Sequence, residues 1–494
     1  MNRPIRVLSL FCLILFLALM ANVTYVQYFR SGSLDTHAGN QRREQADFSR
    51  KRGAILAGKF TIADSVKSND PYLYQRRYPK GYEYSPITGF FSFKYGEDRG
   101  IEASQNDLLA GNDDRLFVNQ LVDLVNNAQP EGGNVETTIN PRVQDAAWKG
   151  LTALGPGVQG AAVAIEPSTG KILAMVSTPS YDPSGLASHD VKTSDAAWKS
   201  LNANSSDSPL FNRAIQTPLP PGSTFKLVTS AAALEAGVKP TDEFNGLPTY
   251  KIPGHSSAIV NENNESCGNM GRTKVTFQQA LDYSCNAAFA DLTLHHLSGA
   301  QLRDQAVKFG FDQATLDDIP LVAQSQFPDR NLSDPAFLAL RAIGQYDVAA
   351  TPLQMAMVSA GIANGGVVMK PYLVNRLTSS KLDVLEQTSP REIDRAISPQ
   401  TASTLTNMMI DVVDHGTGTN AQIPGIAVAG KTGTAQSSPS RPPYAWFTSF
   451  APAQNPKIAV AVLVQKSGTA RTDIAGGALA APIAKAMMEA EISQ

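Results

Sequence analysis

A stretch without charged side chains near the start of the chain limits where the rest of it can fold. No charged residue occurs from Val7 to Phe29. With Ile5 included, the apolar part of this stretch reaches about 20 residues, which is long enough for a helix to cross a bilayer. Arg3 and Arg6 precede it, and the positive-inside tendency then places the amino terminus in the cytoplasm. We therefore predict a single-pass transmembrane signal anchor over residues 1–29, with the rest of the chain on the extracytoplasmic face of the cell membrane.

Removal of this segment as a signal peptide is the alternative interpretation. A cleavage site needs small residues two positions apart, whereas Leu19 lies two positions before Ala21. Cys12 lacks the small residue before it that is typical of a lipoprotein site. An uncleaved anchor fits the sequence better.

Export changes how the cysteines are interpreted. Cys12 lies in the predicted membrane segment, which leaves Cys267 and Cys285 in an oxidising compartment where a disulfide between them can persist. Its short loop would contribute about 3 kcal/mol of stability in the chain-entropy model. Two free, buried thiols remain the alternative.

Composition excludes two classes of function. The chain has 494 residues, enough for two or three folding units, and a formal net charge of -2. No nucleic-acid partner is expected, because such proteins normally carry a basic excess on some domain. The 6 histidines are scattered and neither an HExxH nor a CxxC spacing occurs, so no metal site is predicted.

The residues after the anchor divide into two regions. From 30 to 156 the chain is polar and rich in turn residues, with basic clusters such as Arg50-Lys51-Arg52 and Arg76-Arg77. Its one long amphipathic helix is expected from Pro141 to Leu154. We predict a small N-terminal pedestal domain over residues 30–156, which lies between the membrane and a larger domain over residues 157–494.

The larger domain combines strand and helix patterns. A strand, a turn and a returning strand are predicted between Ala161 and Val176. The middle of the domain is helical, as in Phe225–Ala236 and Phe277–His295, and a closing helix is expected over Ala480–Ile492. One sheet with strands from both ends of the domain and a helical insertion between them is an α+β architecture. The short apolar strands near the carboxy terminus are Ile426–Ala429, Ala445–Phe450 and Lys457–Val464.

Three short motifs carry residues suited to chemistry, and the first is Ser223-Thr224-Phe225-Lys226 at the start of an apparent helix. A serine and a lysine three positions apart share one helix face. A lysine with a lowered pKa can then take the serine proton. Alone, this spacing more often means a helix-terminal serine and a solvated lysine.

The second motif, Ser284-Cys285-Asn286, is expected near the middle of a helix, where a hydroxyl and an amide can relay a proton and orient a lysine. Alone, such residues usually satisfy local backbone groups. The third motif, Lys431-Thr432-Gly433-Thr434, is expected at the end of strand Ile426–Ala429. A lysine and two hydroxyls on an edge strand suit a carboxylate, and the glycine lets a substrate backbone approach.

The segment Gly425–Thr432 also fits G-x-x-x-x-G-K-T, the nucleotide-binding P-loop pattern. A P-loop has a flexible loop between its glycines, whereas here the four intervening residues are the predicted strand. No strand ending in a magnesium-binding aspartate accompanies it, and export would separate the region from ATP. Nucleotide binding is therefore not predicted.

In this order and at these separations, the three motifs resemble the signature of penicillin-binding proteins and serine β-lactamases. From Gly160 to Ile492 the chain resembles the transpeptidase domain of class B penicillin-binding proteins, with similar stretches at Glu166–Gly170 and Gly416-Thr417-Gly418. The resemblance implies an antiparallel sheet with flanking helices. The pedestal is similar through Arg52-Gly53-Ala54-Ile55, although Leu56-Ala57-Gly58-Lys59 replaces the usual D-R-N-G continuation. The short pedestal and overall length are most similar to the penicillin-binding protein A group of actinobacteria.

The resemblance also implies a role for the residues of the first two motifs. Ser223 would attack the penultimate D-alanine of a peptidoglycan stem peptide that ends in D-Ala-D-Ala, with Lys226 as general base. Ser284 would carry the proton towards the leaving amine. Asn286 would hold Lys226 and the substrate amide.

The residues of the third motif would bind the substrate. Lys431 would supply positive potential, Thr432 and Thr434 would bind the terminal carboxylate, and Gly433 would admit the substrate backbone. The backbone amides of Ser223 and Thr434 would hold the oxyanion.

The implied partners are stem peptides, β-lactams as covalent inhibitors, the cytoplasmic membrane, and a separate glycan polymerase with division proteins; no cofactor is implied. A D,D-carboxypeptidase, which passes the acyl group to water, is the closest alternative. A β-lactamase would leave the pedestal unexplained, and a β-lactam sensor would carry a larger membrane part. A non-catalytic division scaffold would not need three intact motifs.

Overall fold

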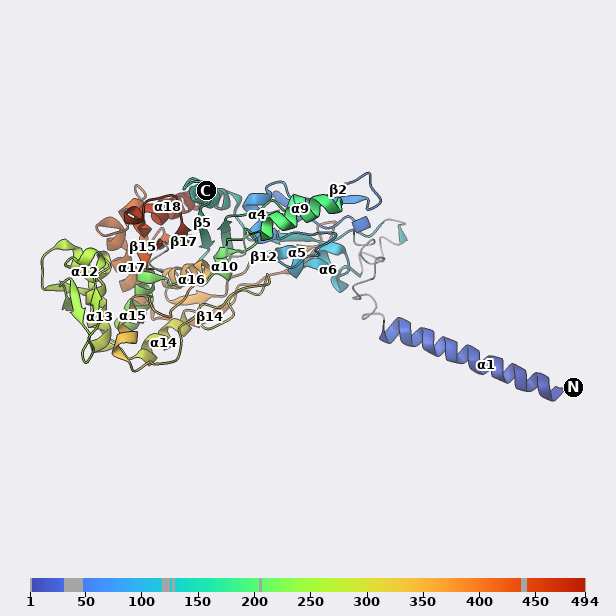
Figure 1. The fold of residues 1–494 in the computed structure, drawn as a ribbon, viewed down its shortest axis with the longest axis horizontal. Helices are drawn as coiled ribbons and strands as arrows, with labels where there is room; N and C mark the ends of the chain where they lie inside the picture. Colours follow the sequence, from blue (N-terminus) through green and yellow to red (C-terminus); the bar gives the residue numbers. More distant parts are fainter. Residues whose placement is uncertain are drawn as a thin grey trace.

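The computed structural model describes residues 2–30, 48–117, 125–126, 129–203, 207–436 and 442–493. Helix α1 (Asn2–Thr24) and a π-helical turn (Tyr25–Phe29) form the amino-terminal segment in Figure 1. Among the described residues this is the one helix long and apolar enough to cross a membrane, with a mean hydropathy of 2.5 and no burial. It agrees with the predicted anchor, whose orientation stays a prediction.

A five-stranded antiparallel sheet forms the centre of the larger region, in the order β15-β16-β17-β5-β6. Its strands come from both ends of that region, as predicted, so β17 pairs with β5 in the middle of the sheet (Figure 1). The strands are β5 (Gln159–Ile165), β6 (Ile172–Thr178), β15 (Ala429–Ala435), β16 (Tyr444–Ala451) and β17 (Ile458–Lys466).

Both faces of this sheet are covered. Alternate residues of β5 and β17 belong to two different hydrophobic cores, one on each face. Helices α8 (Pro141–Thr152) and α18 (Ala481–Ile492) pack on one face, and α16 (Pro352–Ala363) packs on the other. Strands that are buried on both faces are apolar throughout, which explains the continuous apolar runs in the sequence.

The regular structure between β6 and β15 is mainly helical, as predicted. The helix expected over Phe225–Ala236 is confirmed by α11 (Lys226–Glu235). Six short strands pair in this part: β7 (Glu243–Asn245), β8 (Thr249–Lys251), β9 (Ala258–Val260), β10 (Lys274–Thr276), β11 (Val367–Met369) and β14 (Glu392–Arg395). The other helices are α9 (Val191–Asn202), α10 (Arg213–Gln216), α12 (Phe277–Asp282), α13 (Asn286–His296), α14 (Gly299–Lys308), α15 (Pro335–Ala342) and α17 (Pro399–Asp414).

Two predicted elements were wrong, and both carry motif residues. The single helix expected from Phe277 to His295 is two helices, α12 and α13, because Ser284 between them has a left-handed φ of 61° that an α-helix cannot contain. The strand expected over Ile426–Ala429 begins only at Ala429 and contains the whole Lys431–Thr434 motif, paired with β16. The Lys431–Thr434 part of this strand was missed because its sequence is polar rather than apolar, and strand preference depends on the surroundings of each face of the strand.

The pedestal contains a second sheet, in the order β13-β12-β4-β1-β2-β3. Two of its strands, β12 and β13, come from the second half of the chain, whereas α8 from the predicted pedestal packs on α18 and β6. We infer that the two regions exchange these elements, and that the boundary lies between β4 and α8 rather than at residue 156. The strands are β1 (Ile55–Ala57), β2 (Phe60–Lys67), β3 (Tyr74–Arg77), β4 (Asn134–Thr137), β12 (Val374–Thr378) and β13 (Val384–Gln387).

A buried ion cluster holds the pedestal together around the carboxylate of Glu102, which is fully buried. It accepts hydrogen bonds from Arg52 Nε at 2.7 Å and Arg76 Nε at 2.6 Å. The Tyr78 hydroxyl donates a third at 3.0 Å. Burial alone would raise the pKa of Glu102, but Arg76 and Arg52 outweigh burial and lower that pKa below its usual 4.5. Two arginines that made this region look polar in the sequence therefore lie in its interior.

Replacing Glu102 with glutamine is expected to lower the free energy of unfolding by about 3–5 kcal/mol, because two buried guanidinium charges would lose their counter-charge. Since the folded-state pKa of Glu102 is lowered, its contribution is complete above the usual value of 4.5 and is lost as pH falls through the folded-state value. Urea unfolding of the full chain in detergent micelles measures both effects. Glu131→Gln, at an exposed ion pair with Lys51, is the matched control. Equal unfolding midpoints for the two variants would contradict the prediction.

Candidate active site

Ser223 lies in a 3₁₀ turn (Gly222–Phe225) that leads directly into helix α11. Gly222 has a φ of 54°, and its N–H donates to the Gly344 carbonyl at 3.0 Å. A Cβ atom on Gly222 would come within 3.1 Å of the Ala435 backbone in β15. Glycine therefore allows the serine turn to lie against the edge strand of the sheet.

Lys226, three residues after Ser223, has a fully buried side chain. Its Nζ donates to the Ser284 carbonyl at 2.6 Å and to Asn286 Oδ1 at 2.8 Å, and it lies 3.3 Å from Ser284 Oγ. Two close acceptors match the two N–H bonds of a neutral amine, whose lone pair is then left to take a proton.

Lys431, on strand β15, also reaches the Ser284 hydroxyl. Its Nζ, also fully buried, donates to Ser284 Oγ at 2.9 Å and to the Thr432 carbonyl at 3.0 Å. The left-handed turn at Ser284 lets the carbonyl of this residue meet one lysine while its hydroxyl meets both. The structure thus brings together residues from all three sequence motifs.

The two lysines share one buried site, which lowers the pKa of both to different extents. Burial lowers the pKa of Lys226 well below its usual 10.5, and the positive charge of Lys431 lowers it further. Burial also lowers the pKa of Lys431, to about 7, although Asp282 and Glu262 act in the opposite direction. The pKa of Asp282 is itself raised to about 6, chiefly by burial. The stronger lowering at Lys226 makes it the member of the pair that gives up its proton more readily, whereas Lys431 keeps its proton to higher pH.

A groove of about 920 Å³ opens above this pair of lysines. The Thr432 hydroxyl in its wall lies 2.5 Å from the Thr417 hydroxyl. A Cβ atom on Gly433 would come within 3.0 Å of the Pro221 carbonyl oxygen, so glycine is needed where β15 passes the serine turn. The sequence-predicted residues that line the groove are Ser223, Ser284, Asn286, Thr432, Gly433 and Thr434.

Several residues that line the groove were not predicted from the sequence, among them Asn261, Glu262 and Thr417. Thr417 belongs to a stretch noted only for its family resemblance. Nothing in the sequence singles out Asn261 and Glu262, because their loop reaches the second motif through tertiary hydrogen bonds and a disulfide. One of these bonds runs from the Ala287 N–H to Asn261 Oδ1 at 2.8 Å.

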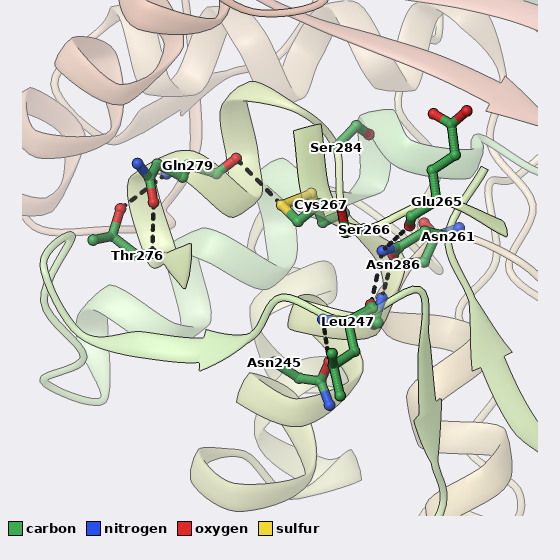
Figure 2. Close-up of a disulfide and its surroundings, with 12 residues drawn as sticks. Asn245, Leu247, Asn261, Glu265, Ser266, Cys267, Thr276, Gln279, Ser284 and Asn286 are labelled. Atoms are coloured by element: carbon green, nitrogen blue, oxygen red, sulfur yellow. Dashed lines mark hydrogen bonds between the residues drawn. A yellow bond between two sulfur atoms is a disulfide. The ribbon is translucent and has the colours of Figure 1, made fainter. Parts of the chain in front are cut away.

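A disulfide joins Cys267 to Cys285, the middle residue of the second motif (Figure 2). Of the two states that the sequence left open, the structure contains the bridged one. The disulfide connects the turn at Ser284 to the loop that carries Asn261, and both cysteines are buried. Figure 2 shows the sulfur atoms between helix α12 and this loop.

Replacing both cysteines with alanine is expected to lower stability by about 3 kcal/mol through the entropy of the opened loop. Thermal unfolding in detergent micelles, with and without dithiothreitol, measures the loss. The reductant should lower the melting temperature of the wild type but leave the Cys267→Ala/Cys285→Ala variant unchanged. A wild type that melts at the same temperature after complete reduction would contradict the prediction.

Comparison with known proteins assigns this geometry to a family. Residues 160–489, about two thirds of the chain, match the model described as the penicillin binding protein transpeptidase domain. The chain belongs to the class B penicillin-binding proteins. Residues 52–135 match the model described as the penicillin binding protein A dimerisation domain. The predicted family, fold class and serine acyltransferase chemistry are confirmed.

Relatives of this penicillin-binding protein are similar over their full length. The peptidoglycan D,D-transpeptidase PbpA of Mycolicibacterium smegmatis is 43% identical, over 100% of both chains. The enzyme of the same name from Mycobacterium tuberculosis is 42% identical, over 100% of this chain and 99% of that one. A solved ceftriaxone acyl-enzyme of penicillin-binding protein A from M. tuberculosis has a TM-score of 0.84 at 42% identity, covering 91% of this chain and 100% of that chain. Its penicillin G acyl-enzyme has a TM-score of 0.83 at 43% identity, covering 90% and 100%.

The lowered pKa of Lys226 predicts how acylation of this penicillin-binding protein depends on pH. Only the neutral amine can take a proton, so the acylation rate should rise with pH and level off well below 10.5, the usual lysine value. The second-order rate constant for benzylpenicillin, measured from about pH 5 to about pH 10, checks this. A rate that still climbs as pH approaches the usual lysine value would show that Lys226 is not the base.

Proposed function

We propose that this penicillin-binding protein crosslinks peptidoglycan stem peptides as a serine D,D-transpeptidase, and that β-lactams acylate it at Ser223. The observation that carries the proposal is the position of Ser284 Oγ, 2.9 Å from Lys431 Nζ and 3.3 Å from Lys226 Nζ. These groups can move a proton between nucleophile and leaving group near neutral pH. Support also comes from relatives that are named peptidoglycan D,D-transpeptidases and from β-lactam acyl-enzymes of penicillin-binding protein A.

In the first step Lys226 takes the hydroxyl proton of Ser223 while Oγ attacks the carbonyl carbon of the penultimate D-alanine. The new C–O bond forms as the peptide C–N bond breaks. Ser284 passes a proton to the departing nitrogen, so that the terminal D-alanine leaves as an amine. A β-lactam follows the same path, except that its leaving amine stays attached to the acyl group.

In the second step an amine from a neighbouring stem peptide attacks the ester carbonyl. The C–N bond of the crosslink forms, the bond from carbon to Ser223 Oγ breaks, and the serine recovers a proton. The positive charge of Lys431 attracts the carboxylate of the donor, which Thr432 and Thr434 bind. The amides of Ser223 and Thr434 hold the oxyanion in both steps, and losing such a donor typically costs about 10²–10³-fold in rate.

Mass spectrometry of the full chain in detergent micelles tests the proposal. Benzylpenicillin should give one stable adduct, on the peptide that contains Ser223, and a synthetic D-Ala-D-Ala stem peptide with an amine acceptor should give a crosslinked product. Rapid drug hydrolysis without an adduct would indicate a β-lactamase. Stem peptides that are shortened but never crosslinked would indicate a carboxypeptidase, and no reaction would indicate a scaffold.

We also propose a location and partners for this activity. The apolar helix α1 anchors it in the cytoplasmic membrane, and the groove acts on the extracytoplasmic face, where peptidoglycan lies. We propose that a separate polymerase, which works with division proteins, supplies the glycan chains; this agrees with family matches to a transpeptidase domain and a dimerisation domain. Protease accessibility of the groove domain in intact spheroplasts tests this orientation.

A further inference from the structure

Among the described residues that line the groove, one charged side chain is not used by the reaction above. Glu262 lines the groove together with Ser223 and Ser284, and its side chain is exposed. Among the described residues, its carboxylate has no hydrogen-bond or ion-pair partner. A carboxylate in this groove repels an anionic donor and is suited to attract a substrate of opposite charge.

The backbone around Glu262 is fixed to the catalytic motif. The residue before it, Asn261, is buried and accepts a hydrogen bond from the Ala287 N–H at 2.8 Å. Its Nδ2 donates to the carbonyls of Leu247 and Glu265, each at 3.1 Å. Figure 2 shows these bonds converging on Asn261 beside Asn286.

A second connection comes from the motif itself. Asn286, whose Oδ1 accepts from Lys226 Nζ, donates from its Nδ2 to the Val260 carbonyl at 3.0 Å. Two consecutive residues before Glu262 are therefore tied to the start of helix α13. The position of Glu262 over the groove is set by the same residue that holds the general base.

We propose that Glu262 binds the cationic amine of the acceptor stem peptide and thereby directs the acyl group to an amine instead of to water. This rests on the proposed transpeptidase function and adds the recognition of its second substrate. An alkyl amine is protonated at neutral pH, so it arrives as a cation. The carboxylate attracts that cation. The ammonium then releases one proton to solvent water, and the proton that the attacking nitrogen loses passes through the neutral amine of Lys226 to the departing Ser223 oxygen.

The electrostatics of the lysine pair agree with this placement. Burial lowers the pKa of Lys226 and of Lys431, and the negative charge of Glu262 acts in the opposite direction on both. Its field therefore extends across the groove to the reacting centre. The donor carboxylate is bound on the β15 side of the same groove, which leaves the Glu262 side for a substrate of opposite charge.

The test compares full-length wild type, Glu262→Gln and Glu265→Gln in detergent micelles. Glu265 is an exposed carboxylate on the same loop that does not line the groove, so Glu265→Gln is the matched control. Each protein receives a D-alanyl thioester donor with one of two nucleophiles. One is a tripeptide with a free side-chain amine, and the other is hydroxylamine, which is uncharged at neutral pH. Mass spectrometry gives the ratio of aminolysis to hydrolysis.

For Glu262→Gln we expect the ratio with the cationic tripeptide to fall about fivefold or more, while the ratio with hydroxylamine changes less than about twofold. The control variant should match the wild type with both nucleophiles. Unchanged ratios for Glu262→Gln would overturn the inference, and slower hydrolysis would show instead that Glu262 activates water. If the acylated wild type gives no amide product with either nucleophile, transpeptidation itself fails and the inference falls with it.

Discussion

The Ser223→Ala variant is expected to form no covalent adduct with benzylpenicillin and to lose on the order of 10⁴-fold or more of the crosslinking rate. Alanine removes the oxygen that attacks the carbonyl, while the lysine pair and the groove remain in place. Intact-mass analysis after long exposure to the drug measures the adduct, and product formation from stem peptides measures the rate. The drug should still bind reversibly, because Lys431 and Thr432 are unchanged.

Ser200→Ala provides the matched control for this variant. Ser200 is an exposed serine on helix α9, away from the groove, and its replacement should leave acylation and crosslinking as in the wild type. A drug adduct on the Ser223→Ala variant would assign the nucleophile to another residue. Equal loss in both variants would indicate a general defect in the protein.

Most strands of the central sheet could be predicted because each follows a simple local sequence pattern. Strands β5, β6, β16 and β17 are almost completely buried on both faces, and runs of apolar residues bounded by turn residues are typical of such strands. The helix that begins at the first motif could also be predicted, since a serine turn followed by an apolar helix depends on residues that are neighbours in the sequence. What could be predicted from these patterns was therefore local.

The features that escaped prediction depend on contacts between distant segments. The left-handed turn at Ser284 interrupts a sequence whose helical pattern is otherwise continuous, and a disulfide to Cys267 on the preceding loop holds the adjacent Cys285. Arg52 and Arg76 looked like surface residues because the carboxylate that buries them, Glu102, belongs to another segment. Strand β12 joins the pedestal sheet from the far half of the chain, which no local pattern indicates.

The site combines two lysines that would destabilise each other if both were charged. In the folded protein the pKa of each is lowered, so below the usual 10.5 the unfolded chain binds more protons than the folded chain does. The pair therefore costs stability at neutral and lower pH, a cost that disappears as pH rises above the unfolded value. Retaining both lysines at this cost is expected only where one must be neutral and the other positive.

Arginine substitutions separate these two roles. Lys226→Arg is expected to reduce acylation on the order of 10²–10⁴-fold, because a guanidinium group stays protonated and cannot accept the serine proton. Lys431→Arg keeps the positive charge that attracts the donor carboxylate, so it should retain much more activity than Lys226→Arg.

The second-order rate constant for benzylpenicillin measures both variants, and Lys192→Arg, at an exposed lysine on helix α9, is the matched control. Thermal unfolding identifies any variant whose loss reflects misfolding. Lys226→Met provides an uncharged comparison, and it should be as inactive as Lys226→Arg. If Lys226→Arg retained activity while Lys226→Met lost it, the side chain would act by its charge, and the base would have to be Lys431.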